Sequence, residues 1–245
     1  DGPRLIEINT NAGGAFLNAA LARAHRACCE SMGSLMDATA PGLPALDATF
    51  MAMFRAEWKA QRSEAPLRSV LIVDDDPEAQ YLAPEFALAR QLFETHGLRA
   101  AVADARTLQW RNGQLWHPAL PGMAVDMVYN RLTDFDLSDP AHAAVRAAYE
   151  AGATVLTPHP RQADKRNLIT LGDDTLLDAW GVSEADRAVL QAVVPATQAV
   201  TPANADALWA QRRQLFFKPV AGYGAKAAYR GDKITRKAWA DVTAG

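Results

Sequence analysis

Residues 69–76 of the chain read SVLIVDDD, and this stretch decides the fold. Four apolar residues in a row, at positions 70–73, predict a buried strand at residues 69–73 that ends at the three aspartates. Residues 83–95 then carry a helical pattern that closes at His96 and Gly97, and residues 99–103 predict the next strand. A strand, a helix and a second strand in succession are typical of parallel strands joined by a helix.

The same alternation continues on both sides of this region. Asn112 and Gly113 indicate a small hairpin. Beyond them we predict a strand at residues 127–131, a helix at 140–151 and a strand at 154–157. The other predicted elements are a strand at residues 5–10, helices at 16–36 and 45–61, a helix after Asp164, a strand at 214–220 and a return strand at 227–230. Together they predict an α/β fold with a mainly parallel, Rossmann-like sheet.

Asp74, Asp75 and Asp76 also invite comparison with response-regulator receiver domains, which open with a similar strand and helix. Such a domain needs a phosphate-accepting aspartate after its third strand and a lysine after its fifth. Asp126 precedes the strand at 127–131 instead of following it, and no lysine occurs between Lys59 and Lys165. We therefore interpret the three aspartates as a surface or capping feature.

The composition restricts the function. With 245 residues, of which 49% are hydrophobic and 22% charged, the chain can form one large α/β domain or two smaller ones. Its net charge of −3 does not indicate nucleic acid or an anionic membrane as partner. No apolar run is long enough to cross a bilayer, no signal peptide opens the chain, and Cys28 and Cys29 are adjacent without spaced partners. We expect a cytoplasmic protein with reduced cysteines. The oligomeric state stays open, a homodimer included.

The segment around Glu7 and Asn9 is the first candidate for chemistry. In an extended strand Glu7, Asn9 and Asn11 project to one side, and Ile6 and Ile8 to the other. A carboxylate and an amide two residues apart offer oxygen ligands that suit magnesium bound to nucleotide phosphates. The alternative is an edge strand with a polar solvent face, which spacing alone favours.

The second candidate is the segment at residues 216–226, FFKPVAGYGAK. Lys218 lies in an apolar stretch, where a charge is costly unless an anion meets it. Gly222 and Gly224 can expose backbone N–H groups to an anion, although the spacing is not that of a Walker loop. A strand-end lysine before a glycine hairpin explains the segment equally well.

The third candidate is Lys165, which we predict to lie on the first turn of a helix that follows Asp164. The positive end of a helix dipole favours phosphate, and a lysine there adds its charge. Considered alone, the segment is more simply an exposed basic helix start.

Together the three segments resemble ATP-grasp enzymes. FKPV at 217–220 with GYG at 222–224 resembles the lysine strand and glycine-rich loop of that family, and DKRN at 164–167 is similar to its first-lysine segment. LIEINTNAGG at 5–14 is similar to its Glu-x-Asn metal strand. That strand normally follows both lysines, whereas here it comes first. The order resembles circularly permuted ATP-grasp proteins related to glutathionylspermidine-synthase-like ligases.

The resemblance implies three regions: a permuted ATP-grasp segment at residues 1–65, a Rossmann-like pre-ATP-grasp domain at 66–158, and an incomplete ATP-grasp nucleotide-binding segment at 159–245. It implies an ADP-forming carboxylate–amine ligase that uses ATP and Mg²⁺ and acts through an acyl-phosphate on small-molecule or peptide substrates.

The resemblance also assigns roles to individual residues. Lys165 and Lys218 would neutralise phosphates, and Glu7 and Asn9 would bind magnesium. Arg131 is the candidate for the substrate carboxylate. The loop that would cover the β- and γ-phosphates consists of Gly222, Tyr223, Gly224, Ala225 and Lys226.

The chain departs from the family pattern at Asn11 and Ala12, where many relatives have arginine and proline. Asp1 and Gly245 are expected to be cuts through a longer protein, with the adenine hinge and a further metal carboxylate beyond Gly245. Two alternatives remain: a non-catalytic ATP-grasp relative that binds nucleotide or peptide, and a sugar- or nucleotide-binding α/β protein without ligase chemistry. Glu7, Asn9, Lys165 and Lys218 together favour the enzyme.

Overall fold

The computed structural model describes residues 2–9, 13–28, 44–159, 164–220 and 227–244. It divides the chain into two compact units, which we describe separately. Unit 1 comprises Asp1–Asn9 and Arg161–Gly245, and unit 2 comprises Thr10–Pro160. The units therefore divide the chain near residues 9 and 160, whereas the sequence-based regions divide it after residues 65 and 158.

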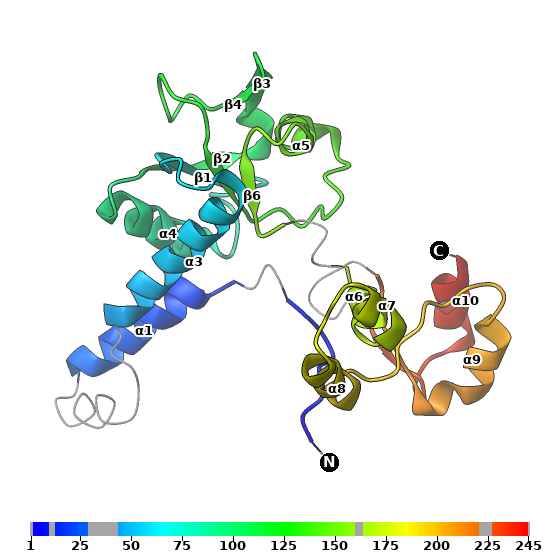
Figure 1. Cartoon of the computed structure of the whole chain (residues 1–245). Coiled ribbons are helices and arrows are strands. Elements are labelled where there is room, and N and C mark those ends of the chain that lie inside the picture. Colours follow the sequence, from blue (N-terminus) through cyan, green and yellow to red (C-terminus); the bar gives the residue numbers. More distant parts are fainter. Residues whose placement is uncertain (1, 10–12, 29–43, 160–163, 221–226, 245) are drawn as a thin grey trace. The chain divides into compact units, whose positions relative to one another are not determined.

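Unit 2 contains a parallel sheet of four strands in the order β2-β1-β5-β6 (Figure 1). The strands are β1 (Ser69–Asp74), β2 (Arg99–Asp104), β5 (Met127–Asn130) and β6 (Val155–Thr157). Strand β1 is central, with Ile72 paired to Val102 on one side and to Tyr129 on the other. The predicted Rossmann-like parallel sheet is confirmed.

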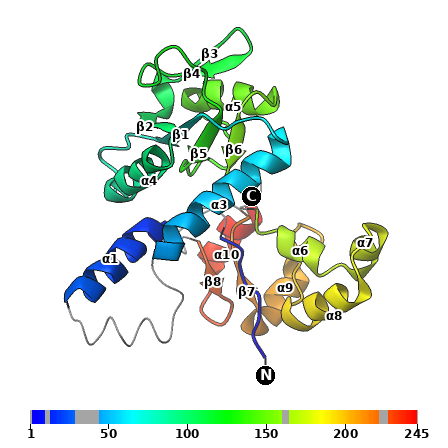
Figure 2. The ribbon, with the colours of Figure 1, turned by 60° about the vertical axis from the view of Figure 1, so that its left-hand side comes forward.

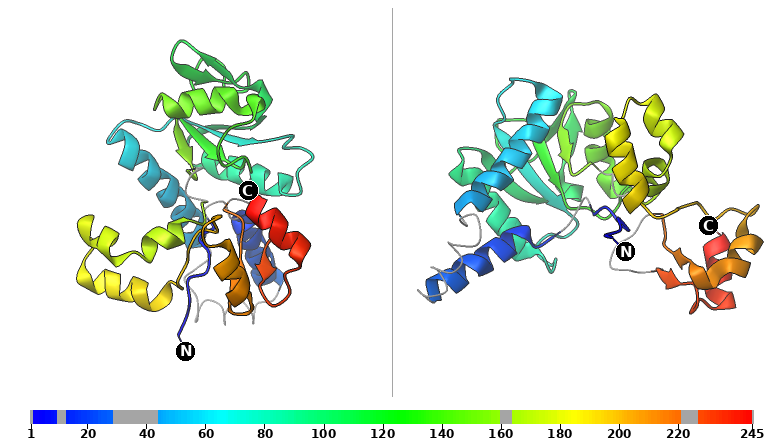
Figure 3. Two further views of the ribbon diagram at one scale, coloured as in Figure 1. Left: turned by 90° about the vertical axis from the view of Figure 1, so that its right-hand side faces the viewer. Right: turned by 60° about the horizontal axis from the view of Figure 1, so that its bottom comes forward.

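Both faces of this sheet are covered, because successive residues of β1 point to opposite sides. Val70 and Ile72 belong to an apolar cluster with residues of α1 (Ala15–Cys28), α3 (Pro44–Arg62) and α4 (Ala83–Thr95), among them Phe54 and Phe93. Leu71 and Val73 pack into a second cluster with residues of α5 (Ala143–Glu150) and of the hairpin β3–β4 (Gln109–Arg111 and Gln114–Trp116). The result is a three-layer unit, visible in Figure 3. The short 3-10 helices η1 (Ala105–Thr107) and η2 (Pro140–His142) complete it.

A buried carboxylate ties two helices of unit 2 together. Glu85, in the first turn of α4, is fully buried and accepts the backbone N–H groups of Phe16 at 3.1 Å and Leu17 at 2.9 Å. These N–H groups open α1 and have no partner within their own helix. The contact therefore caps α1, and the positive end of that helix offsets the charge of Glu85.

Unit 1 contains the N-terminal segment and two small groups of helices and strands. The first contains α6 (Asn167–Leu171), α7 (Asp174–Ala179) and α8 (Glu184–Val193), in which α7 packs against both neighbours (Figure 2). The second contains α9 (Ala205–Gln211), η4 (Arg212–Gln214), the antiparallel pair β7 (Phe216–Phe217) and β8 (Tyr229–Arg230), and α10 (Arg236–Ala244). Leu208, Phe217, Ile234 and Trp239 form its core. None of the described helices of either unit is long and apolar enough to cross a membrane.

Two predicted strands of unit 1 are wrong. Residues 5–9 form no strand: the Leu5 N–H donates to the Val193 carbonyl at 2.9 Å, which is not part of a ladder, and Thr10 lies outside the described residues. The strand predicted at 214–220 is only Phe216–Phe217 in the structure, because Pro219 has no N–H to donate to a neighbouring strand. The return strand is present as β8.

Candidate functional site

Lys218 directly follows β7, and its position results from strand alternation. Phe217 points into the core of unit 1, where its ring lies 5.0 Å from that of Trp239. Its neighbours Phe216 and Lys218 therefore point away from that core. Lys218 keeps 24% of its side chain exposed, and Phe216 is 57% exposed. The lysine thus lies beside the strand end and not within the strand, which corrects the prediction.

Glu7 is the partner of Lys218. The Lys218 Nζ donates to Glu7 Oε2 at 2.6 Å and to the backbone carbonyl of Ile6 at 3.1 Å. The hydrogen bond from Lys218 lowers the pKa of Glu7, burial opposes this shift, and the charges of Lys218 and Lys165 lower the pKa further. Glu7 is therefore ionised at neutral pH, and the two residues form an ion pair inside unit 1.

This contact and the exposure of the neighbouring residues argue against one interpretation of the N-terminal segment. A solvated edge would expose the polar side chains and cover the apolar ones. Instead Ile6 and Ile8 are 63% and 40% exposed, whereas Glu7 is half-buried against Lys218. The interpretation as an edge with a polar solvent face is therefore wrong for Glu7. Asn9 is exposed.

Lys165 belongs to the same unit and is held by its backbone, whose N–H donates to the Val220 carbonyl at 3.0 Å. The predicted helix after Asp164 is only α6, which begins at Asn167 and has five residues. Asp164 forms an ion pair with Arg166. Lys165 therefore lies outside the helix, and a dipole argument does not apply to it; its link to Glu7 is its charge.

The glycine-rich loop predicted to cover phosphates, residues 222–226, lies outside the described residues.

Arg131 belongs to unit 2, where it follows β5. It is 6% exposed, its Nη1 lies 3.4 Å from the Tyr129 hydroxyl, and its guanidinium lies 5.4 Å from the centre of the Tyr129 ring. Gly13 approaches so closely that a Cβ there would lie 3.3 Å from Arg131 Nη2 and 2.5 Å from a methyl group of Leu82. The glycine thus makes room for side chains of its own unit. The carboxylate-binding role of Arg131 stays a prediction.

A second polar cluster, not predicted from the sequence, lies in unit 2 at the carboxyl ends of β1 and β5. The strand order reverses direction between these two strands, and the loops that follow them diverge there. His142 is buried, with Nδ1 2.8 Å from Asp134 Oδ2 and Nε2 2.9 Å from Asp75 Oδ1. Ionised carboxylates only accept hydrogen bonds, so both ring nitrogens must carry protons. We call Asp75, Asp134 and His142 the histidine clamp.

The protonation of the clamp follows from its contacts. Burial alone would lower the pKa of His142, but the hydrogen bonds and charges of Asp75 and Asp134 outweigh burial and raise it. Burial acts to raise the pKa of Asp134, but hydrogen bonds from Asp139, His142 and Ser138 bring this pKa below its usual range. The clamp thus joins the loop after β1 to the loop after β5 through an imidazolium ion.

Asp74 corrects another expectation, because it is 9% exposed and is not a surface residue. Burial raises the pKa of Asp74 to about 6, although the bond from the Asp75 N–H at 2.9 Å and the charge of Arg131 act in the opposite direction. Its ionised form is therefore destabilising. A folded-state pKa above the unfolded value means that the contribution to stability is full below about pH 4 and is lost as the pH rises through 6.

We predict that Asp74→Asn stabilises unit 2 at high pH. The amide oxygen can still accept the Asp75 N–H, but no charge has to be buried. At pH 8 the variant should exceed the wild type by about 1–2 kcal/mol, and the difference should vanish near pH 4. The measurement is the opening free energy of β1 amides by hydrogen exchange. Asp76→Asn, the same charge change at an exposed neighbour, should stay within about 0.5 kcal/mol; a pH-independent gain at Asp74 would contradict the prediction.

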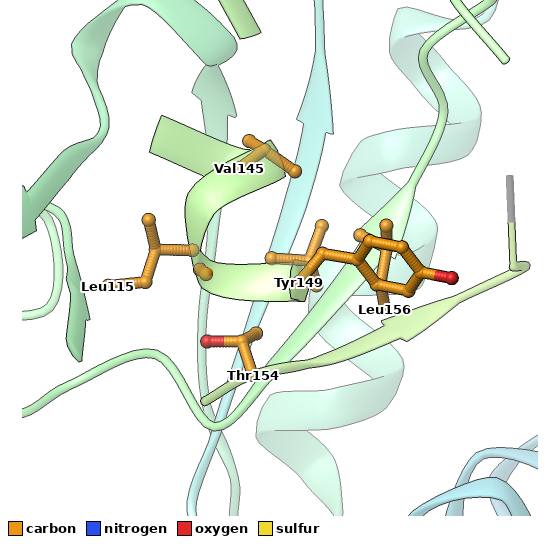
Figure 4. A pocket seen from close by; sticks show the side chains of 7 residues that line it. Leu115, Val145, Tyr149, Thr154 and Leu156 are labelled. Atoms are coloured by element: carbon orange, nitrogen blue, oxygen red, sulfur yellow. The ribbon is translucent and has the colours of Figure 1, made fainter. Parts of the chain in front are cut away.

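Two cavities in unit 2 belong to neither polar cluster. A gap under α5, lined by Val145, Tyr149 and Leu156 among others (Figure 4), leaves no room for a water molecule. An open groove of about 460 Å³ lies over α3 and is bordered by Arg55, Lys59 and His96. Neither contains a catalytic arrangement, so the candidate site rests on Glu7, Lys165 and Lys218.

Comparison with known proteins found no matching family model and no matching curated protein.

Proposed function

We propose that this chain carries the nucleotide- and metal-binding residues of an ATP-dependent, ADP-forming carboxylate–amine ligase of the ATP-grasp type. The observation that supports this most is the contact between Glu7 and Lys218, at 2.6 Å, between residues at opposite ends of the sequence. The charge of Lys165 acts on the same carboxylate. A metal–nucleotide complex needs such a combination, with an oxygen ligand for the metal and ammonium groups for the phosphates.

The donor set fits magnesium bound together with a nucleotide. Glu7 and Asn9 offer oxygen atoms only, which magnesium prefers, and this ion commonly takes one or two protein ligands plus phosphate oxygens and water. Among the described residues, no group of three or more His, Cys, Asp or Glu side chains could hold a metal ion alone. The proposed site would therefore bind the metal weakly by itself and tightly together with the phosphates.

The chain's residues have distinct tasks in the proposed reaction. When bound, ATP supplies the phosphoryl group that turns a substrate carboxylate oxygen into a leaving group. The amine nitrogen forms the C–N bond as this C–O bond breaks, giving an amide, ADP, phosphate and a proton. Lys218 and Lys165 would hold phosphate oxygens, and Glu7 and Asn9 would hold the metal. Residues 222–226 are proposed to donate backbone N–H groups to the phosphates.

The decisive experiment measures ADP release by the chain with Mg²⁺, ATP and pools of carboxylic acids and amines. We expect ADP release that needs one member of each pool. Nucleotide binding without ADP release from any pool would indicate the alternative, a non-catalytic nucleotide- or peptide-binding module. Absence of ATP binding would contradict the ligase and the nucleotide-binding module alike.

A further inference from the structure

The Glu7–Lys218 pair occupies the atoms that the proposed function assigns to ligands. Two of the three protons of the Lys218 ammonium are committed, one to Glu7 Oε2 at 2.6 Å and one to the Ile6 carbonyl at 3.1 Å. Both side chains are mostly covered, with 24% of Lys218 and 32% of Glu7 exposed. A phosphate group that approaches Lys218 therefore meets a donor that is already paired, next to a negative charge.

We infer that this pair is a latch that makes nucleotide and metal binding depend on each other, an inference that rests on the proposed function. Without metal, a phosphate must either displace Glu7 from Lys218 or stay close to the Glu7 carboxylate, and both are unfavourable. A magnesium ion on Glu7 offsets that charge and releases Lys218. The coupling is reciprocal, since a phosphate on Lys218 equally releases Glu7 for the metal.

The latch also explains why both residues are half-buried in the absence of ligand. An unpaired, partly buried carboxylate or ammonium is costly, and each residue here neutralises the other. In the free protein Glu7 and Lys218 contact each other, whereas in the loaded protein Glu7 would contact the metal and Lys218 a phosphate. If only one ligand binds, one residue of the pair gains a new partner and the other residue loses its partner.

The first test is ADP binding measured by calorimetry in EDTA and in Mg²⁺, for the wild type and for Glu7→Gln. The glutamine keeps the length of the side chain and removes its charge. In EDTA we expect the variant to bind ADP about 5- to 20-fold more tightly than the wild type. Magnesium should tighten ADP binding by the variant much less than ADP binding by the wild type. Because magnesium also binds ADP in solution, the ratio of the two dissociation constants is compared between proteins.

The matched control is Asp232→Asn, which makes the same charge change in the same unit. Asp232 pairs with Arg230 at 2.9 Å, and among the described residues it forms no ion pair with Lys218. It should change the ADP affinity in EDTA by less than about twofold. An equal gain in this variant would show a general charge effect and would overturn the latch.

A second test uses the wild type alone and decides the question if Glu7→Gln does not fold. Mg²⁺ without nucleotide should increase the rate at which an amine-specific reagent labels Lys218, followed by mass spectrometry, and should leave the exposed Lys237 unchanged. Unchanged labelling of Lys218, or no tighter binding by Glu7→Gln in EDTA, overturns the latch while the proposed function stands. If the wild type binds no ADP even with Mg²⁺, the proposed function fails and the latch with it.

Discussion

Lys218→Ala is expected to weaken ATP binding about 10- to 100-fold in the presence of Mg²⁺ and to abolish measurable ADP release. Hydrogen bonds to charged groups contribute about 1.5–3 kcal/mol each, which corresponds to this range. The Glu7 carboxylate, 2.6 Å from this ammonium in the ligand-free protein, would have the metal as its counter-charge, so the loss of affinity reports the missing contact between Lys218 and phosphate. Calorimetric titration with ATP and Mg²⁺ measures the first effect, and a coupled ADP assay measures the second.

Lys237→Ala is the control for this prediction. Lys237 is an exposed lysine of α10 in the same unit, so its removal changes the net charge equally. Its affinity for ATP should stay within about twofold of the wild type, as expected for a screened surface charge. Unchanged ATP affinity in Lys218→Ala would exclude a phosphate-binding role for this lysine. A loss in both variants would indicate only a general electrostatic effect.

Most of unit 2 is predictable because its elements follow from local patterns. The helix predicted at 83–95 coincides with α4, and the strand predicted at 69–73 is β1 without its last residue. Asp74 extends β1 because it pairs with Asp104 of β2, a contact that a single segment cannot reveal. The helices at 16–36 and 45–61 correspond to α1 and α3, although residues 29–43 lie outside the described part of the chain.

Unit 1 is less predictable because its extended segments depend on partners. Apolar alternation predicts that residues 5–9 are extended, but a strand needs a neighbouring backbone, and Leu5 finds only the carbonyl of Val193 at the end of α8. The meeting of Glu7 with Lys218 could be anticipated only by treating the three segments as one site. Alternation does place Glu7 opposite Ile6 and Ile8, in agreement with their exposure.

The histidine clamp could not be predicted from the sequence. Asp75, Asp134 and His142 lie in three different segments, and no spacing rule links them. They meet because the carboxyl ends of adjacent parallel strands lie at one edge of the sheet. The sequence pattern places Asp75 at a strand end, but it gives no reason to choose His142 among five histidines.

His142→Ala is expected to destabilise unit 2 by about 2–4 kcal/mol near pH 6. Removal of one member of a buried ion pair costs about 3–5 kcal/mol, and the exposure of Asp75, whose side chain is 48% accessible, reduces this value. The imidazole of His142 also fills space that an alanine side chain would leave empty. A urea titration followed through the amide NMR signals of β1 and β5 reports unit 2 specifically, and His25→Ala, on the exposed side of α1, should stay within about 0.5 kcal/mol.

The pH dependence of this destabilisation distinguishes an ionic contribution of His142 from a contribution of packing alone. The folded-state pKa of His142 is raised, so its contribution is full below the unfolded value of 6.5 and is lost as the pH rises through the folded value. The pKa of Asp134 is lowered, so its contribution is present above the unfolded value of 3.8 and is lost as the pH falls through the folded value. The difference between wild type and His142→Ala should therefore be largest between about pH 4 and 6.5. A difference that stays constant from pH 5 to pH 9 would mean that His142 stabilises unit 2 by packing alone and that the imidazolium does not join the two loops.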